Sequence, residues 1–194
     1  MKYLIIYFSF SGNNRLLAEY LATQIGCDFC PVVEKKRRTG VTILLDTLFR
    51  REPKIQPLEH SVSDYDHIIL VAPIWDAKLA HPMKTLIKQE KAALTSYSFI
   101  SLCGYERPQQ QESITQELLS LSGRLPSTVC QLRICDLFPL EKRNDVPTIS
   151  RYHVTRDDLI QFASQIAEFL RAHPLPSPAA TDLGIASSGD DLLA

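Results

Sequence analysis

Short apolar runs alternate along the chain with longer amphipathic stretches. Runs that are apolar on both faces are typical of strands buried inside a parallel sheet, and their alternation with helices is typical of the α/β class. The predicted strands cover residues 2–8, 29–33, 67–72, 97–102 and 128–134. The pattern therefore predicts a doubly wound, five-stranded parallel sheet with helices on both faces, a three-layer α/β/α architecture.

Helical periodicity fills the intervals between these strands. Helices are expected from Asn13, over residues 40–51, from residues 80–82, around residues 114–121 and from Thr155. Pro82 would stand at a helix start, where its missing N–H costs nothing, and Thr155 with Asp158 has the spacing of a capping box. The predicted buried stripes are Leu17, Leu21 and Gln24 or Ile25; Val41, Leu44, Leu45 and Leu48; Leu79, Met83, Leu86 and Ile87; Ile114, Leu118 and Leu121; and Leu159, Phe162, Ala163, Ile166, Phe169 and Leu170.

The last residues differ from the rest of the chain. Residues 173–194 combine prolines, small polar residues and isolated apolar residues without periodicity. Such a composition cannot bury enough apolar surface to become ordered. We therefore expect one domain over residues 1–172, followed by a disordered tail over residues 173–194.

Composition limits the classes of partner. The net charge is −1 at pH 7, with 45% hydrophobic and 22% charged residues, as in ordinary soluble globular proteins. A balance so close to neutral indicates neither a nucleic acid nor an anionic membrane surface as partner. The longest apolar run, residues 68–74, is too short to span a bilayer. The five cysteines are odd in number and favour a reduced, cytoplasmic protein.

Candidate chemistry begins directly after the first predicted strand, at Ser9, Phe10, Ser11, Gly12, Asn13 and Asn14. Hydroxyls, a glycine and a helix N-terminus with free N–H groups together form a binding site for an anion. The Ser9 and Ser11 side chains and the amides of residues 10–14 would hold a phosphate, and Asn13 or Asn14 would cap the helix. The commoner patterns GxxxxGK[ST] and GxGxxG are missing. A plain strand–helix turn is the alternative.

This Ser-x-Ser-Gly-Asn loop resembles the phosphate loop of the flavodoxin family, which implies that the bound phosphate is that of FMN. The resemblance also implies the sheet order 2-1-3-4-5 and a ligand at the carboxyl ends of the strands. The family usually has Thr or Ser where Asn14 stands, so an amide would replace one hydroxyl.

The segment after the third predicted strand also resembles the family. It contains Pro73, Ile74 and Trp75, followed by Asp76 and Ala77. The resemblance implies that Trp75, the only tryptophan, stacks on the isoalloxazine. Asp76 and Ala77 would lie against the reactive edge of the flavin, and Ala77 stands where the family often has glycine. The alternative for Trp75 is a side chain half-buried under the loop.

A third segment, after the fourth predicted strand, contains Cys103, Gly104 and Tyr105. Its backbone amides would contact the pyrimidine edge of the flavin, and Tyr105 would be a second stacking partner. Tyr105 could equally cover a helix end.

The resemblance thus implies an FMN-binding redox protein, either an electron carrier or an FMN-dependent NAD(P)H- or quinone-type oxidoreductase. Its partner would be a reductase, NAD(P)H or a quinone-like acceptor. Soluble flavodoxin carriers are typically strongly acidic, so the net charge of −1 favours the oxidoreductase. The alternative is a flavodoxin-fold binding module that has lost its cofactor. A response-regulator-like domain is disfavoured, because Ser9 and Ser11 stand where that class needs an acidic pair.

Other motifs are weaker. Cys27 and Cys30 have C-x-x-C spacing but fall before a strand, whereas a redox dithiol needs a helix N-terminus. The sequence has no second C-x-x-C pair that would complete a zinc site, and the spacing of the histidines is not that of metal ligands. Residues 35–38 form a basic cluster, most simply a solvated loop, although an acidic partner or the 2′-phosphate of NADPH would also fit. His81 is interpreted as a helix-start residue, with proton donation near the flavin as the alternative.

Overall fold

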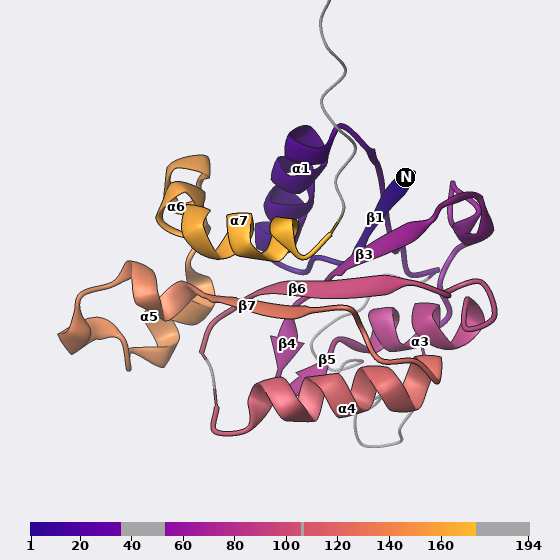
Figure 1. Ribbon diagram of the computed structural model, residues 1–194. Helices are drawn as coiled ribbons and strands as arrows, with labels where there is room; N and C mark the ends of the chain where they lie inside the picture. Colours follow the sequence, from indigo (N-terminus) through magenta and orange to yellow (C-terminus); the bar gives the residue numbers. More distant parts are fainter. Residues whose placement is uncertain (36–52, 106, 174–194) are drawn as a thin grey trace, which may run out of the picture.

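The computed structural model describes residues 1–35, 53–105 and 107–173. A parallel sheet in the order β2-β1-β3-β6-β7 forms its centre (Figure 1). Its strands are β1 (Tyr3–Tyr7), β2 (Asp28–Pro31), β3 (His67–Val71), β6 (Tyr97–Cys103) and β7 (Val129–Arg133). Numbered among themselves, these strands have the order 2-1-3-4-5. The predicted fold class and sheet order are therefore confirmed.

Helices cover both faces of the sheet. Figure 1 shows α1, α6 and α7 on one face, α3 and α4 on the other, and α5 beyond the carboxyl ends of the strands. The helices are α1 (Asn13–Ile25), α3 (His81–Gln89), α4 (Gln110–Ser122), α5 (Val146–Arg151), α6 (Arg156–Gln161) and α7 (Ala163–Arg171), with 3₁₀ turns η1 (Val62–Asp64), η2 (Ile134–Leu137) and η3 (Leu140–Lys142). The predicted helix over residues 40–51, most of the basic cluster and the predicted tail beyond His173 lie outside the described residues.

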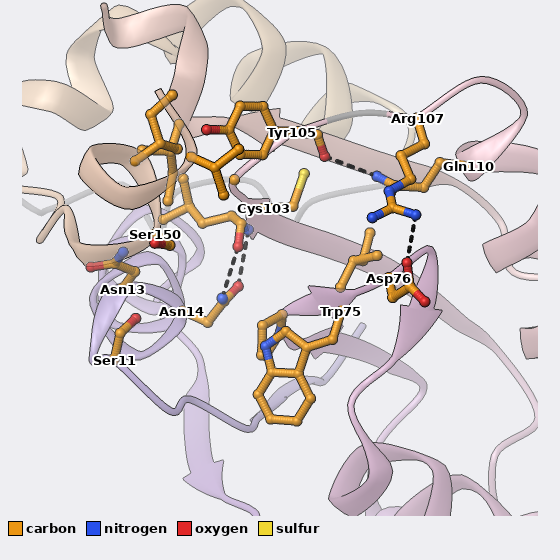
Figure 2. Close-up of a pocket in the computed structure, with 17 residues that line it drawn as sticks. Ser11, Asn13, Asn14, Trp75, Asp76, Cys103, Tyr105, Arg107, Gln110 and Ser150 are labelled. Atoms are coloured by element: carbon orange, nitrogen blue, oxygen red, sulfur yellow. Dashed lines mark hydrogen bonds and ion pairs between the residues drawn. The ribbon is translucent and has the colours of Figure 1, made fainter. Parts of the chain in front are cut away.

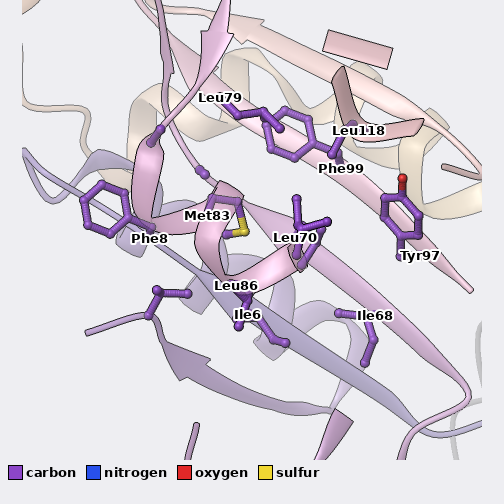
Figure 3. Packing of buried hydrophobic residues seen from close by; sticks show 14 of the residues in the cluster. Ile6, Phe8, Ile68, Leu70, Leu79, Met83, Leu86, Tyr97, Phe99 and Leu118 are labelled. Atoms are coloured by element: carbon purple, nitrogen blue, oxygen red, sulfur yellow. The ribbon is translucent and has the colours of Figure 1, made fainter. Parts of the chain in front are cut away.

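The core has two parts because successive residues of a strand point to opposite faces of the sheet. Ile6, on the face covered by α3 and α4, joins Met83 and Leu118 (Figure 3). Ile5, on the other face, joins Leu17 and residues of α6 and α7. Both faces of the central strands are therefore buried, as the continuous apolar runs predicted.

Two predicted helix starts agree with the structure. Pro82 occupies the first turn of α3. Thr155 and Asp158 form the capping box of α6, with Thr155 Oγ1 accepting from the Asp158 N–H at 3.3 Å.

The last predicted helix, however, is not continuous. It breaks at Phe162, whose N–H donates to the carbonyls of both Leu159 and Ile160, as in a tight 3₁₀-like turn. The break turns Ala163 to solvent instead of into the predicted buried stripe. In α1, Ile25 is buried and Gln24 is exposed.

The sequence pattern missed a small antiparallel hairpin after β3. Strands β4 (Ile74–Trp75) and β5 (Lys78–Leu79) pair with each other. The two turn residues, Asp76 and Ala77, have φ of 51° and 56°, which is the backbone of a type I′ turn. Asp76 is a common first residue of this turn, but Ala77 stands where glycine usually follows.

The cysteines support no redox dithiol. All five lie within the described residues and are free thiols. Burial raises the pKa of the Cys27 thiol to about 11 and that of Cys30 to about 12, whereas a reactive thiol has a lowered pKa. Separately, none of the helices in the described part of the chain combines the length and apolarity that a bilayer crossing needs.

Candidate functional site

A cavity of about 350 Å³ opens at the carboxyl ends of the strands, where the loops after β1, β3 and β6 meet. In open α/β sheets ligands bind at this edge, where the strand order reverses. Most of the residues predicted from the sequence line it: Ser11, Asn13, Asn14, Pro73, Ile74, Trp75, Asp76, Cys103, Gly104 and Tyr105. The other four predicted residues are not among the lining residues: Phe10, Gly12 and Ala77 are each next to one in the chain, and Ser9 lies two residues before Ser11. Three loops from distant parts of the sequence therefore line one cavity.

The loop after β1 ends in a helix N-terminus without a side-chain cap. Gly12 is the N-cap residue of α1, with φ of 95°, a backbone that glycine adopts without strain. The first intrahelical hydrogen bond runs from the Leu16 N–H to the Gly12 carbonyl at 3.0 Å. The N–H groups of Asn13, Asn14 and Arg15 thus have no acceptor within the helix. The Gly12 N–H, by contrast, donates to Ser9 Oγ at 3.1 Å.

The predicted cap by Asn13 or Asn14 is wrong, because both amides bind distant backbone instead. Asn13 donates to the Tyr152 carbonyl at 2.8 Å and accepts from the Val154 N–H at 3.0 Å. Asn14 binds Leu102 in the same two-bonded manner. Both side chains are buried, and they fix α1 against the β6 end and against the segment after α5.

Trp75 belongs both to the cavity and to the edge of the core. It lines the cavity, is half-buried and packs against the core on the α3 side. Phe8 and Phe10 contact it edge-on, with ring centroids at 6.1 and 5.9 Å. These edge contacts fix the orientation of the indole plane at the cavity.

An ion pair crosses from the hairpin to the loop after β6. Arg107 Nη1 lies 2.5 Å from Asp76 Oδ1, and both side chains are mostly exposed. Figure 2 shows this pair on the opposite side of the cavity from Ser11, Asn13 and Ser150. The sequence analysis did not single out Arg107, because an arginine in a loop carries no pattern of its own.

A residue of α4 holds the loop after β6 in place. Gln110, which is buried, donates from Nε2 to the Tyr105 carbonyl at 3.2 Å. The Tyr105 ring packs against the core on the α1 side, and its buried hydroxyl has no hydrogen-bond partner among the described residues. Burial raises the pKa of Tyr105, with smaller contributions from Cys135 and Asp145.

A further wall comes from α5, which the sequence analysis missed. Its residues Val146, Ile149 and Ser150 line the cavity. Asp145 caps the helix by accepting from the Thr148 N–H at 3.2 Å and from its hydroxyl at 2.7 Å. Asp145, with a proline two residues later, is a helix-start signal that could have identified α5. The helix has too few turns for a readable apolar stripe.

Other candidate groups do not join the site. His81 is the first residue of α3 and is not a lining residue. Within residues 1–35, 53–105 and 107–173, His, Cys, Asp and Glu side chains form no group of three or more suited to a metal ion.

Comparison with known proteins identifies the fold. No family model matches the sequence, and no curated protein is significantly similar to it. Among solved structures, a flavoprotein from Lactobacillus acidophilus NCFM in complex with FMN matches with a TM-score of 0.58 at 23% identity, over 67% of this chain and 92% of that chain. The apo form of the flavoprotein from that organism gives 0.54 at 22% identity, over 67% and 91%. The Trp repressor binding protein from Bacillus subtilis gives 0.50 at 14% identity, over 90% and 100%.

At these identities the likeness concerns the fold. Together with the strand order 2-1-3-4-5, it shows that this chain has the flavodoxin-like fold.

Proposed function

We propose that the cavity binds FMN noncovalently and that the protein is an FMN-dependent redox protein. The observation that carries the proposal is the meeting, in one cavity at the switch point of the sheet, of the α1 N-terminus and the Trp75 side chain. The first suits a phosphate and the second a flat aromatic ring. The structural neighbour solved with FMN has the same fold.

The phosphate end of the cavity fits this assignment. A Cβ placed on Gly12 would meet nothing within 4 Å, so open space lies before the loop. The N–H groups of Asn13 to Arg15 and the positive end of the helix dipole favour an anion there. Among the described residues that line the cavity, only Asp76 carries a carboxylate, and it lies on the far side and is paired with Arg107.

The ring end fits as well. A volume of about 350 Å³ lies within the range of small-molecule sites, roughly 300–1,000 Å³. Trp75 would stack on the flavin, and the Asp76–Ala77 turn would lie along the reactive edge. The Cys103–Tyr105 loop, which Gln110 holds, would meet the pyrimidine edge.

FMN, when bound, supplies the electron or hydride transfer. The protein holds the phosphate at α1, orients the ring against Trp75 and shields it from water with Leu102, Ile134 and Ile149. The net charge of −1 provides little of the long-range steering on which a strongly acidic carrier relies. We therefore favour an oxidoreductase that uses NAD(P)H or a quinone-like partner over a pure electron carrier.

One observation favours a second candidate, a binding module without a cofactor. The Gly12 N–H and the Asn14 amide, which would be phosphate ligands in the flavin reading, already have partners within the protein. The remaining donors of the loop must then suffice for FMN.

An equilibrium titration with FMN, followed by Trp75 fluorescence, tests the proposal. Gly12→Val should abolish binding, because a β-branched residue disfavours φ of 95° and its side chain would occupy the open space that we assign to the phosphate. Gly26→Val is the matched control: Gly26 is also at positive φ, 70°, with open space around it, but at the far end of α1. Loss of affinity in Gly12→Val alone supports the phosphate loop, whereas unchanged affinity in that variant contradicts it.

A further inference from the structure

The helix α5 turns one face toward the cavity. Val146, Ile149 and Ser150 line it, and their i, i+3, i+4 spacing places them on one side of a helix. Ser150 is the polar member of this face and is exposed.

The end of α5 is tied to the phosphate loop. The two hydrogen bonds of Asn13 to Tyr152 and Val154 hold the chain that follows Ser150 against the first turn of α1. Figure 2 shows Ser11, Asn13 and Ser150 along the same side of the cavity. Ser150 therefore lies at the anion-binding end, away from the Asp76–Arg107 pair.

The Ser150 hydroxyl is available for a ligand. Its only hydrogen bond among those described is a local one of 3.2 Å to the Pro147 carbonyl, and a hydroxyl rotates readily to a better acceptor. The loop itself is short of donors, since the Gly12 N–H and the Asn14 amide are engaged. A phosphate oxygen at α1 would accept from a hydroxyl on the facing wall.

We propose that Ser150 is a phosphate-binding residue of this site and that α5 makes the site selective for the phosphorylated flavin. This inference rests on the proposed FMN binding. Ser11 and the α1 amides would contact the phosphate from one side and Ser150 from the other, so that two elements far apart in the sequence enclose it.

The test compares FMN with riboflavin, which has the same ring system and no phosphate, in Ser150→Ala and Ser150→Glu. We expect Ser150→Ala to lower the affinity for FMN about tenfold, as for the loss of a partly exposed hydrogen bond to a charged group. Ser150→Glu should lower the affinity for FMN at least a hundredfold, because the carboxylate repels the phosphate. The affinity for riboflavin should stay within about twofold of the wild-type value in both variants. Ser113→Ala and Ser113→Glu, on the exposed side of α4, are the matched controls.

The outcomes separate the two proposals. If the wild-type protein binds neither flavin, FMN binding itself fails and this inference fails with it. If the wild type binds FMN and the Ser150 variants bind it equally well, only the role of Ser150 is overturned. Equal losses for FMN and riboflavin would also overturn it, because they indicate a disturbed wall and not a lost phosphate contact.

Discussion

The Asn14 side chain forms two hydrogen bonds with the backbone of Leu102: its Nδ2 donates to the carbonyl at 3.0 Å, and its Oδ1 accepts from the N–H at 2.9 Å. Leu102 is buried near the carboxyl end of β6, where it lines the cavity. Asn14 thus binds the β6 backbone beyond the last residue pair of β3 and β6, Val71 with Ile100, while β7 still pairs with Leu102 on its other side. The first turn of α1, to which we assign the phosphate, therefore also connects the helix to β6 through hydrogen bonds.

Replacing Asn14 should therefore affect folding. Asn14→Ala leaves the Leu102 N–H and carbonyl buried without partners, and we expect a loss of about 2–4 kcal/mol in the free energy of unfolding. Urea unfolding measures this loss. Asn144→Ala, at an exposed position, should change stability by less than about 0.5 kcal/mol. A near-neutral Asn14→Ala would mean that these hydrogen bonds contribute little to stability.

Trp75 provides a local reporter because the chain has no other tryptophan. FMN should quench its fluorescence on binding. Trp75→Ala should lower the affinity for FMN about tenfold, because the stacking contact is lost; flavin fluorescence measures the affinity of this variant. Trp75→Phe should retain most of the affinity. Phe29→Ala, an exposed aromatic on β2, should leave FMN affinity unchanged. If Trp75→Ala binds FMN as tightly as the wild type, Trp75 does not stack on the flavin.

Ala77 adopts a left-handed backbone with φ of 56°, which costs a non-glycine residue about 1 kcal/mol. Ala77→Gly should relieve this strain and raise the free energy of unfolding by up to about 1 kcal/mol. The same change at Ala167, exposed in the regular helix α7, should lower it by about 1 kcal/mol. Denaturant melts of the two variants should thus shift in opposite directions. Destabilisation by both would show that the turn is unstrained.

We expect stability to depend on pH through His67. It is buried between Ser96 and Ser98, with ring nitrogens at 2.8 and 3.1 Å from their hydroxyls, and 4.7 Å from the ring of His173. Burial, and secondly His173, lowers its pKa from 6.5 to about 4. Between pH 4 and pH 6.5, the His67 side chain binds a proton in the unfolded chain but not in the folded protein. The free energy of unfolding therefore falls as the pH decreases below 6.5.

For His67 alone the loss should be about 2 kcal/mol at about pH 5 relative to about pH 7.5. His67→Gln, which keeps a polar group between the serines, should reduce the acid-induced loss by about that amount in urea titrations at the two pH values. His153→Gln, at an exposed histidine, should not. An identical pH dependence of the wild type and His67→Gln would exclude His67 as its source.

The fold could be predicted from the sequence because its strands are buried on both faces and therefore read as continuous apolar runs, most clearly at Ile68–Val71 in β3. The cavity could be predicted for a related reason: in a parallel sheet the segments that follow the strands must meet at one edge. The capping box at Thr155 and the proline in α3 are local signals, and the structure contains both.

The remaining features depend on partners far apart in the sequence. Asn13 and Asn14 look like helix caps locally, but their partners lie 139 and 88 residues away. The α5 wall was missed because a helix as short as Val146–Arg151 has no legible period. The hairpin turn has Asp76 at its first position but Ala77 where glycine usually follows, so the sequence carries only half of the signal for its type.

The most direct test of the central claim is a visible absorption spectrum of the purified protein, recorded again after addition of FMN and desalting. We predict a flavin band that stays with the protein and is released as free FMN on denaturation. A protein that remains colourless after FMN addition and desalting would contradict FMN binding and favour the binding module without a cofactor.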